Sequence, residues 1–383
     1  MQSINSNLIK KQYEQFSIKN HFKYQNSASL VAPADSKLLF NISGGVRYQN
    51  ELLGLKKTDL EKVSSIQECV RTDSLDKIGY SQRHHLFFEM LGHFMFYLCN
   101  EKECKGEFIN FAFKFLTKEI GLDKNRIFVT VHSQDNVTID VWKKIGNTNL
   151  ILSDNNTFVS PYADKSALRT EIKWLKNDNS LVELWNLVFT QFDSKELFKN
   201  PMNFIAADSG ASLERIVSAY ENKDNNYENS MWKDYIDYLT TLSSKGTIED
   251  YRRLADFFNT SVKLFNEGII PGNKVQAYVL RKLLRTIFDL CNKLDINYID
   301  LIDNYFKFAG ILSVTNNEVL KLLKEELEKY QLTINNGIIQ AQKLIRKKGI
   351  ENVSVNYLKS TCGLPDYIIN DILNNEQMIL VKK

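Results

Sequence analysis

The sequence has little of the residues that mark several specialised protein classes. Its 383 residues include only 5 Pro and 16 Gly, which excludes collagen-like and Pro-rich chains. Charge of neither sign dominates, because 49 Lys and Arg stand against 46 Asp and Glu. The net charge of +3 excludes a polybasic binder and leaves room only for a local basic surface. A hydrophobic content of 43% excludes a disordered chain, and the length allows two or three domains at roughly 150 residues each.

Cysteines and long apolar runs are also scarce. The five cysteines are an odd number and no two form a CxxC pair, which argues against a disulfide framework or a structural zinc site. The apolar segment 86–98 is interrupted by Glu89, Gly92 and His93, and no segment reaches the roughly 20 apolar residues that span a membrane. The N-terminus has no apolar core of a secretory signal. We therefore expect a soluble, cytoplasmic protein with no membrane partner.

Strand and helix patterns are mixed in the first part of the chain. The segments expected there are helices at 3–20 and 105–120, strands at 127–132, 184–192 and 204–208, and extended segments at 28–40 and 58–98. They show no regular βαβ alternation, which favours an α+β fold with an antiparallel sheet. From about residue 248 helical periodicity dominates. We therefore predict two domains, 1–245 and 246–383, of which the second is all-helical.

Three charged residues lie at positions suited to ligand binding. Arg71 follows a strand-like segment, where an arginine either clamps a phosphate or carboxylate or forms a surface ion pair. Asp208 is expected at the end of a strand, just before Gly210 and a helix that carries Arg215. Asp208 would hold an amine, and Arg215 would stack on a base or bind a phosphate. The alternative is that an Asp or Ser of this segment only caps the N-terminus of the helix and that the charged residues of the helix are solvated. No P-loop or GxGxxG pattern supports another nucleotide-binding fold.

The histidines do not form a metal-binding pattern. His84 and His85 are adjacent, so their side chains diverge on either a helix or a strand, and neither HExxH nor HxxxH occurs. His93 and His132 stand alone. We predict core or hydrogen-bonding roles for these residues and no metal site built from protein side chains.

The segment RHHLFFEMLGHFMFY at 83–97, preceded by CVR at 69–71, resembles motif 2 of the alanyl-tRNA synthetases, which are class II aminoacyl-tRNA synthetases. Other segments resemble the family in the same order along the chain: motif 1 at 28–40, the amino-acid-pocket strand at 183–192, motif 3 at 207–216, and the helical tRNA-recognition domain at 252–258, 269–285 and 360–365. This resemblance implies a class II antiparallel sheet flanked by helices and followed by an all-helical domain.

The resemblance also implies a function. A member of this family is a ligase that uses ATP with Mg²⁺ to activate an amino acid, here alanine or a similar small one, and transfers it to the acceptor stem of tRNA. By this resemblance, Arg71 and Arg215 match the catalytic positions, and the ATP-binding positions are matched by Arg71, Phe88, Met90 and Arg215. The positions that bind the amino acid are matched by Phe158, Val188, Asp208 and Gly210. Those that bind tRNA are matched by Asn273, Arg281 and Arg285.

The sequence departs from the family pattern in several places. The loop after Arg71 is the short TDSLDK, in which Lys77 comes late, and Phe158 stands where the family has a Trp. DKSAL at 164–168 replaces a GPCGP turn, and Ser360 replaces an Asp. An editing domain and a C-terminal oligomerisation region are not seen, so we expect a truncated member whose oligomeric state stays open. These departures favour two alternatives: a paralogue that passes the aminoacyl group to a carrier protein or a small-molecule amine, and a non-catalytic regulatory homologue.

Overall fold

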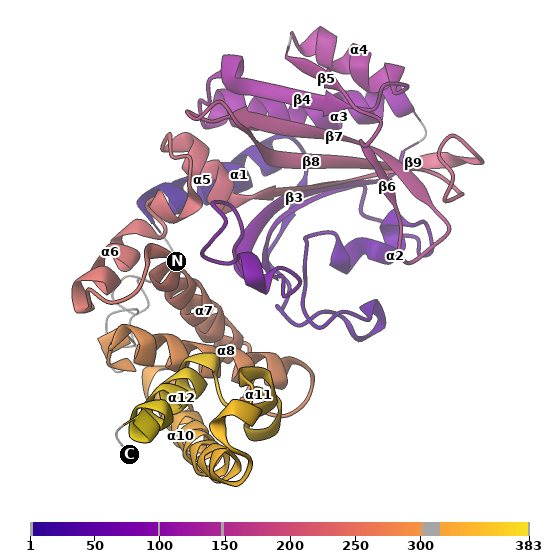
Figure 1. The fold of residues 1–383 in the computed structure, drawn as a ribbon. Helices are drawn as coiled ribbons and strands as arrows, with labels where there is room; N and C mark the ends of the chain where they lie inside the picture. The colour runs from indigo at the N-terminus through magenta and orange to yellow at the C-terminus, as the bar shows by residue number, and fades with distance from the viewer. Residues whose placement is uncertain (1–2, 99, 147–148, 299, 302–314, 382–383) are drawn as a thin grey trace.

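The computed structural model describes residues 3–98, 100–146, 149–298, 300–301 and 315–381 (Figure 1). A broad twisted sheet with helices packed on it occupies the first part of the chain, and a group of helices follows it. The arrangement is an α+β fold followed by a helical region, as the sequence predicts.

Nine strands form one sheet in the described part of the chain. They are β1 (Lys23–Gln25), β2 (Lys62–Val70), β3 (Phe87–Leu98), β4 (Ile127–Val131), β5 (Leu150–Leu152), β6 (Thr157–Val159), β7 (Ser166–Leu175), β8 (Leu181–Phe192) and β9 (Pro201–Ser212). Their order is β1-β2-β3-β9-β8-β7-β4-β5, with β6 paired to β7. Neighbours are antiparallel except for β1 with β2 and β4 with β5, which confirms the predicted antiparallel sheet.

The central strands alternate between two faces with the two-residue period of a β-strand. Trp185, Phe189 and Ala207 belong to the main hydrophobic core. Val188 and Asp208 are the immediate sequence neighbours of Phe189 and Ala207, pair with each other across β8 and β9, and therefore point to the opposite face of the sheet. That face lines a cavity. Successive residues of these strands therefore point in turn to the hydrophobic core and to the candidate site.

The core face is covered by helices of the first part of the chain. These are α1 (Ile4–Lys19), α3 (Glu101–Lys114), α4 (Asn136–Ile145) and α5 (Leu213–Tyr220), while the short α2 (Gln49–Leu52) precedes β2. The Tyr13 ring of α1 packs edge-on against Phe115, at 5.2 Å between centroids, and lies 6.1 Å from Trp185. The predicted helix at 3–20 is confirmed, and the one predicted at 105–120 begins earlier, at Glu101, because Asn100 caps its N-terminus.

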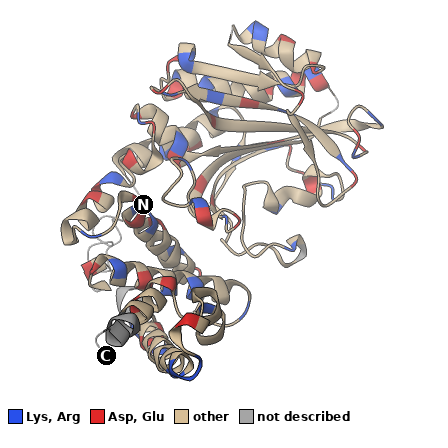
Figure 2. Cartoon of the chain, in the orientation of Figure 1, with Lys and Arg blue, Asp and Glu red and all other residues tan. Residues whose placement is uncertain are grey.

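The rest of the described chain is helical: α6 (Lys233–Leu242), α7 (Ile248–Asn266), α8 (Val275–Leu294), α10 (Thr315–Lys348), α11 (Val355–Cys362) and α12 (Asp366–Val381). The main core continues into α6, α7 and α8, whereas a second cluster around Leu358 and Ile369 joins α10, α11 and α12. We propose that the domain division lies near residue 245. Figure 2 shows Lys and Arg interspersed with Asp and Glu over both parts. No helix among the described residues is long and apolar enough to cross a membrane.

Two predicted segments are wrong in detail. The segment 28–40 forms no regular strand; it holds a 3-10 turn at Ala34–Ser36 and an isolated bridge between Val31 and Phe40. The strand predicted to stop at 208 continues to Ser212, because Gly210 pairs with Asn186 on β8 and gives no turn. Asp208 is therefore internal to β9, and the helix N-cap is Ser212.

Candidate functional site

A cavity of about 410 Å³ lies over β3, β8 and β9 on the face away from the main core. The register of these strands brings its residues together: Asp208 lies opposite Phe94 on one side and Val188 on the other. Seven residues predicted for ATP or the amino acid line the cavity: Arg71, Phe88, Met90, Val188, Asp208, Gly210 and Arg215. Residues from four segments far apart in the sequence thus converge on one concave site.

Arg71 stands at the exit of β2, where its backbone N–H donates to the Leu86 carbonyl at 2.9 Å. Its Nε donates to the Ile42 carbonyl at 2.9 Å, and its guanidinium lies 4.9 Å from the centroid of the Phe88 ring. These contacts fix the plane of the guanidinium. Within the described chain its two Nη groups have no protein partner, so they are available to an anionic ligand.

Arg215 enters the cavity from the first turn of α5, which Ser212 caps. Its Nη1 donates to the backbone carbonyl of Glu183 at 2.9 Å and lies 3.4 Å from the carboxylate of the same residue. Its Nε is buried and has no hydrogen-bond partner among the described residues. Burial lowers the pKa of Arg215, and the positive charges of Arg83 and Arg71 lower this pKa further. The carboxylate of Glu183 opposes this lowering of the pKa. Three arginines thus line one cavity, and their guanidinium groups suit a polyphosphate.

Asp208 is a partly buried carboxylate whose surface is open only to the cavity. Burial raises the pKa of Asp208 to about 7, because a charged carboxylate is poorly solvated there. No ion pair or hydrogen bond from the rest of the described protein compensates its charge. The backbone approaches it closely at Gly45, where a Cβ atom would lie 3.5 Å from Oδ2. A carboxylate in this state is suited to a positively charged ligand group.

The wall beside Asp208 is apolar and tight. Cys69, Phe88 and Met90 form a small hydrophobic cluster on the cavity face. At Gly210, a Cβ atom would lie only 2.7 Å from the Met90 Sδ, so the absence of a side chain is what lets Met90 pack there. This wall leaves space for a flat ring or a small side chain.

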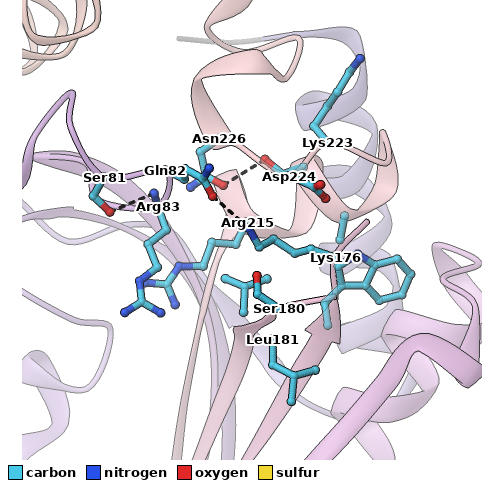
Figure 3. Close-up of a pocket in the computed structure, with 14 residues that line it drawn as sticks. Ser81, Gln82, Arg83, Lys176, Ser180, Leu181, Arg215, Lys223, Asp224 and Asn226 are labelled. Carbon is cyan, nitrogen blue, oxygen red and sulfur yellow. Dashed lines mark hydrogen bonds between the residues drawn. The ribbon is translucent and has the colours of Figure 1, made fainter. Parts of the chain in front are cut away.

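A second cavity, of about 220 Å³, lies against the first and shares Arg83 and Arg215 with it (Figure 3). Its basic lining also includes Lys176, which donates to the Gln82 side chain at 2.9 Å, and Lys223. Arg83 and Arg215 thus stand between two cavities.

Other predicted residues lie elsewhere. Phe158 is on β6 with 44% of its surface exposed and does not line the cavity, so the structure does not bring it to the proposed amino-acid pocket. On α8, Arg281 donates to the Asn273 side chain, whereas the Nε of Arg285 donates to Glu326 at 3.2 Å. Asn273 and Arg281 therefore form one group, and Arg285 belongs to an ion pair within the helices.

The sequence reasoning missed several lining residues, among them Glu183 and Asn186. Glu183 orients Arg215, and Asn186 faces the cavity with its Oδ1 buried and without a partner in the described chain. Both lie in the segment 183–192 that resembles the family's pocket strand, and the alternation with Val188 would have placed Asn186 on the same face.

The family described as tRNA synthetases class II (A) matches residues 8–382. The chain is 31% identical over 411 positions to the alanine–tRNA ligase of Wolbachia pipientis wMel, covering 97% of this chain and 45% of that relative. It is 28% identical over 422 positions to the alanine–tRNA ligase of Orientia tsutsugamushi (strain Boryong), covering 99% and 47%. The chain thus spans about half the length of these curated relatives. A solved apo histidyl-tRNA synthetase of S. aureus is similar with a TM-score of 0.41 and 12% identity, over 56% of this chain and 65% of that one.

Proposed function

The chain belongs to the class II (A) tRNA synthetases, the family of the alanine–tRNA ligases, and we propose that it activates a small amino acid with ATP and transfers it to tRNA. One observation carries this proposal: a single cavity is lined by a partly buried carboxylate without a counter-charge, Asp208, together with Arg71 and Arg215. An amino acid needs a counter-charge for its amine, and ATP needs cations for its phosphates. The cavity offers both.

In the proposed reaction, Asp208 pairs with the ammonium of the amino acid and directs its carboxylate toward the arginines. A carboxylate oxygen forms a bond to the α-phosphorus of ATP, the bond from that phosphorus to the bridging oxygen breaks, and pyrophosphate leaves. Arg71 and Arg215 donate hydrogen bonds where negative charge develops, which lowers the barrier because their guanidinium groups are already oriented.

The apolar wall would select the two substrates by shape. We propose that Phe88 and Met90 flank adenine, with Arg215 stacked on its other face. Val188 and Gly210 would bound the side chain of the amino acid. A pocket of this kind excludes amino acids with bulky side chains but discriminates only weakly between amino acids that differ by one methyl or hydroxyl group.

Members of this family generally use Mg²⁺ with ATP, and the cavity suits an ion carried by the nucleotide. The described residues contain no group of three or more metal-ligating side chains, but Asp73 and Glu183 line the cavity near the arginines. Mg²⁺ typically takes one or two carboxylates together with phosphate oxygens and water. Asp73 and Glu183 would hold it in that way, and the ion would neutralise phosphate charge during the reaction.

The proposal is tested by amino-acid-dependent ATP–pyrophosphate exchange with a panel of amino acids. Exchange with alanine or another small amino acid is expected, and no exchange with any amino acid would leave the non-catalytic alternative. Transfer of labelled amino acid to total tRNA is the second step of the test. Exchange without tRNA labelling would favour transfer to a carrier protein or a small-molecule amine. One observation supports this alternative: Arg285, a residue predicted to bind tRNA, instead forms an ion pair with Glu326.

Gly210→Ala is expected to lower kcat/KM of the exchange reaction by about 10- to 100-fold, because the new Cβ displaces Met90 into the cavity. The fold should survive with a cost of about 1–3 kcal/mol. Steady-state exchange kinetics and thermal unfolding measure the two effects. Gly106→Ala is the matched control: it lies in α3 with nothing within 4 Å of its Cβ, and it should leave exchange unchanged. Equal kinetics for both variants would contradict the placement of Met90.

Arg281→Ala is expected to weaken tRNA binding several-fold and to reduce the slope of log Kd against log salt by about one, as the loss of one phosphate contact does. Its thermal stability should change little, because Arg281 contacts Asn273 and the ring of Tyr278, both of which are exposed. Filter binding across a salt series measures both quantities.

Arg285→Ala provides the contrast on the same helix. It leaves Glu326, whose side chain is 6% exposed, without its ion-pair partner, so it should cost about 1–3 kcal/mol of stability. Its salt slope should stay that of the parent. A slope that changes for Arg285→Ala and not for Arg281→Ala would reverse the assignment.

A further inference from the structure

The second cavity has an excess of positive charge that the cavity proposed for ATP does not have. Among the described residues, three carboxylates and three arginines line the larger cavity. The second cavity is lined by one carboxylate, Asp224, and by four cationic side chains, namely Arg83, Lys176, Arg215 and Lys223. A partly enclosed space with such an excess attracts a ligand that carries several negative charges.

Lys176 is a cation of the second cavity that does not line the larger one. It follows β7, and its backbone N–H donates to the Ser180 carbonyl at 2.9 Å, which closes the turn into β8. Its Nζ donates to the Gln82 side chain at 2.9 Å and to the Asp178 carboxylate at 2.8 Å. An ammonium has three N–H groups, so one remains for a ligand after these two bonds have fixed its position.

Arg83 offers a second cation, on the border between the two cavities. Its side chain is exposed, and its guanidinium has no protein partner in the part of the chain that the structure describes. The charge of Arg83 adds to burial in lowering the pKa of Arg215, so these two guanidinium groups repel each other. Figure 3 shows them beside each other. A ligand with several anionic oxygens would relieve this repulsion.

The size of the second cavity selects among such ligands. Its volume of about 220 Å³ is roughly half that of the larger cavity, at about 410 Å³, which suits a small anion rather than a whole nucleotide. Its cations come from the loop before β3, the end of β7 and α5. A ligand that reaches all three segments needs oxygens on more than one phosphorus, as in a diphosphate.

We propose that the second cavity binds pyrophosphate, with Lys176, Arg83 and Arg215 around its oxygens. The inference rests on the proposed function, in which pyrophosphate is the leaving group. Pyrophosphate freed from the nucleotide leaves a cavity in which arginines and carboxylates balance for one in which cations are in excess. Arg83 and Arg215 line both cavities, so they can keep contact with the ion as it moves. ATP itself does not reach Lys176.

Lys176→Gln tests this assignment, because it removes the charge and keeps a side-chain donor for Gln82 and Asp178. It should raise the KM for pyrophosphate in the exchange reaction about five- to tenfold and leave the KM values for ATP and amino acid within about twofold of the parent. Lys176→Arg keeps the charge and should restore most of the affinity. Exchange kinetics with each substrate varied in turn measure these constants in the full chain.

Lys165→Gln is the matched control. Lys165 pairs with the exposed Asp193 at 2.7 Å and is 12% exposed, whereas Lys176 pairs with the exposed Asp178 and is 10% exposed. Lys165 lines neither cavity. Its substitution should keep all three KM values, and thermal unfolding shows whether the two variants lose similar stability.

Calorimetric titration with sodium pyrophosphate alone, without ATP or amino acid, measures the site directly. The parent should bind pyrophosphate at least about tenfold more tightly than inorganic phosphate, which has too few oxygens to contact all three cations. Lys176→Gln should weaken this binding by about the factor seen in KM. Equal affinity for both anions would overturn the assignment to pyrophosphate.

The outcomes separate this inference from the proposed function. If the parent supports exchange but Lys176→Gln changes the KM for pyrophosphate no more than Lys165→Gln does, the inference is overturned and the proposed function stands. An equal rise in the KM for ATP also overturns it, because Lys176 would then act on the nucleotide cavity. If no amino acid supports exchange while pyrophosphate binds and Lys176→Gln weakens it, the site stands and the proposed activity fails.

Discussion

Arg71→Ala is expected to lower amino-acid-dependent ATP–pyrophosphate exchange by about 10³-fold, the upper range for the loss of one oriented donor to developing charge. The Ile42 carbonyl and the Phe88 ring hold the guanidinium so that its Nη groups face the cavity. Alanine removes the charge and both donors. Arg71→Lys should be intermediate, because an ammonium keeps the charge without the planar pair of donors. Steady-state exchange at saturating ATP and amino acid measures kcat for each variant.

Arg47→Ala is a closely matched control. Arg47 donates to the Asn26 carbonyl at 2.9 Å and lies 5.0 Å from the Tyr48 ring centroid, so it makes the same two kinds of contact outside the cavity. Its exchange rate should equal that of the parent. If Arg71→Ala also stays within about threefold of the parent while folded, Arg71 is not a donor to the charge that develops in the reaction.

The architecture follows from short-range patterns in the sequence. The alternation around Val188 places the core on one face of β8 and the cavity on the other, and apolar periodicity predicts α1 and the helices after Ile248. The misassigned segments lack such a period. The strand was expected to end before Gly210, yet Gly210 continues β9, and its missing side chain accommodates Met90 from the neighbouring strand β3. A local sequence pattern cannot predict a contact between residues on two different strands.

The candidate site is only partly accessible to sequence reasoning for the same reason. The positions of Arg71, Asp208 and Arg215 beside predicted strands indicate ligand binding, and the family resemblance implies their roles. The register of the strands then brings them to one cavity. The partner of Arg285 is 41 residues away and Asp256, the partner of His85, is 171 residues away, and neither follows from spacing. Pairings of that range depend on how helices pack, and they decide which charged groups are free for a ligand.

Asp208→Asn is expected to abolish exchange and at the same time to stabilise the protein at neutral pH. Burial raises the pKa of Asp208 to about 7, above its ordinary value of 3.8, so the folded state resists the ionisation that the unfolded chain undergoes. The free energy of unfolding therefore falls as the pH rises from about 4 to about 7, by roughly 4 kcal/mol for this group. Asparagine removes that loss. Chemical denaturation of both proteins between pH 4 and pH 8 measures this effect. The difference between their free energies of unfolding should be small at pH 4, increase toward pH 7 and then stay constant.

The same titration sets the pH dependence of amino-acid binding. Below pH about 7 the free protein holds Asp208 mostly neutral, and a neutral carboxyl offers no counter-charge to an ammonium. Apparent affinity for the amino acid should therefore rise about tenfold per pH unit up to pH 7 and then level off, whereas Asp208→Asn should bind weakly at every pH. Asp193→Asn, at an exposed ion pair with Lys165, should keep the parental profile. If the Asp208→Asn protein is more stable and still supports exchange at the parental rate, the proposed role of Asp208 fails. That result would show that the negative charge destabilises the fold and is not needed to bind the amino acid.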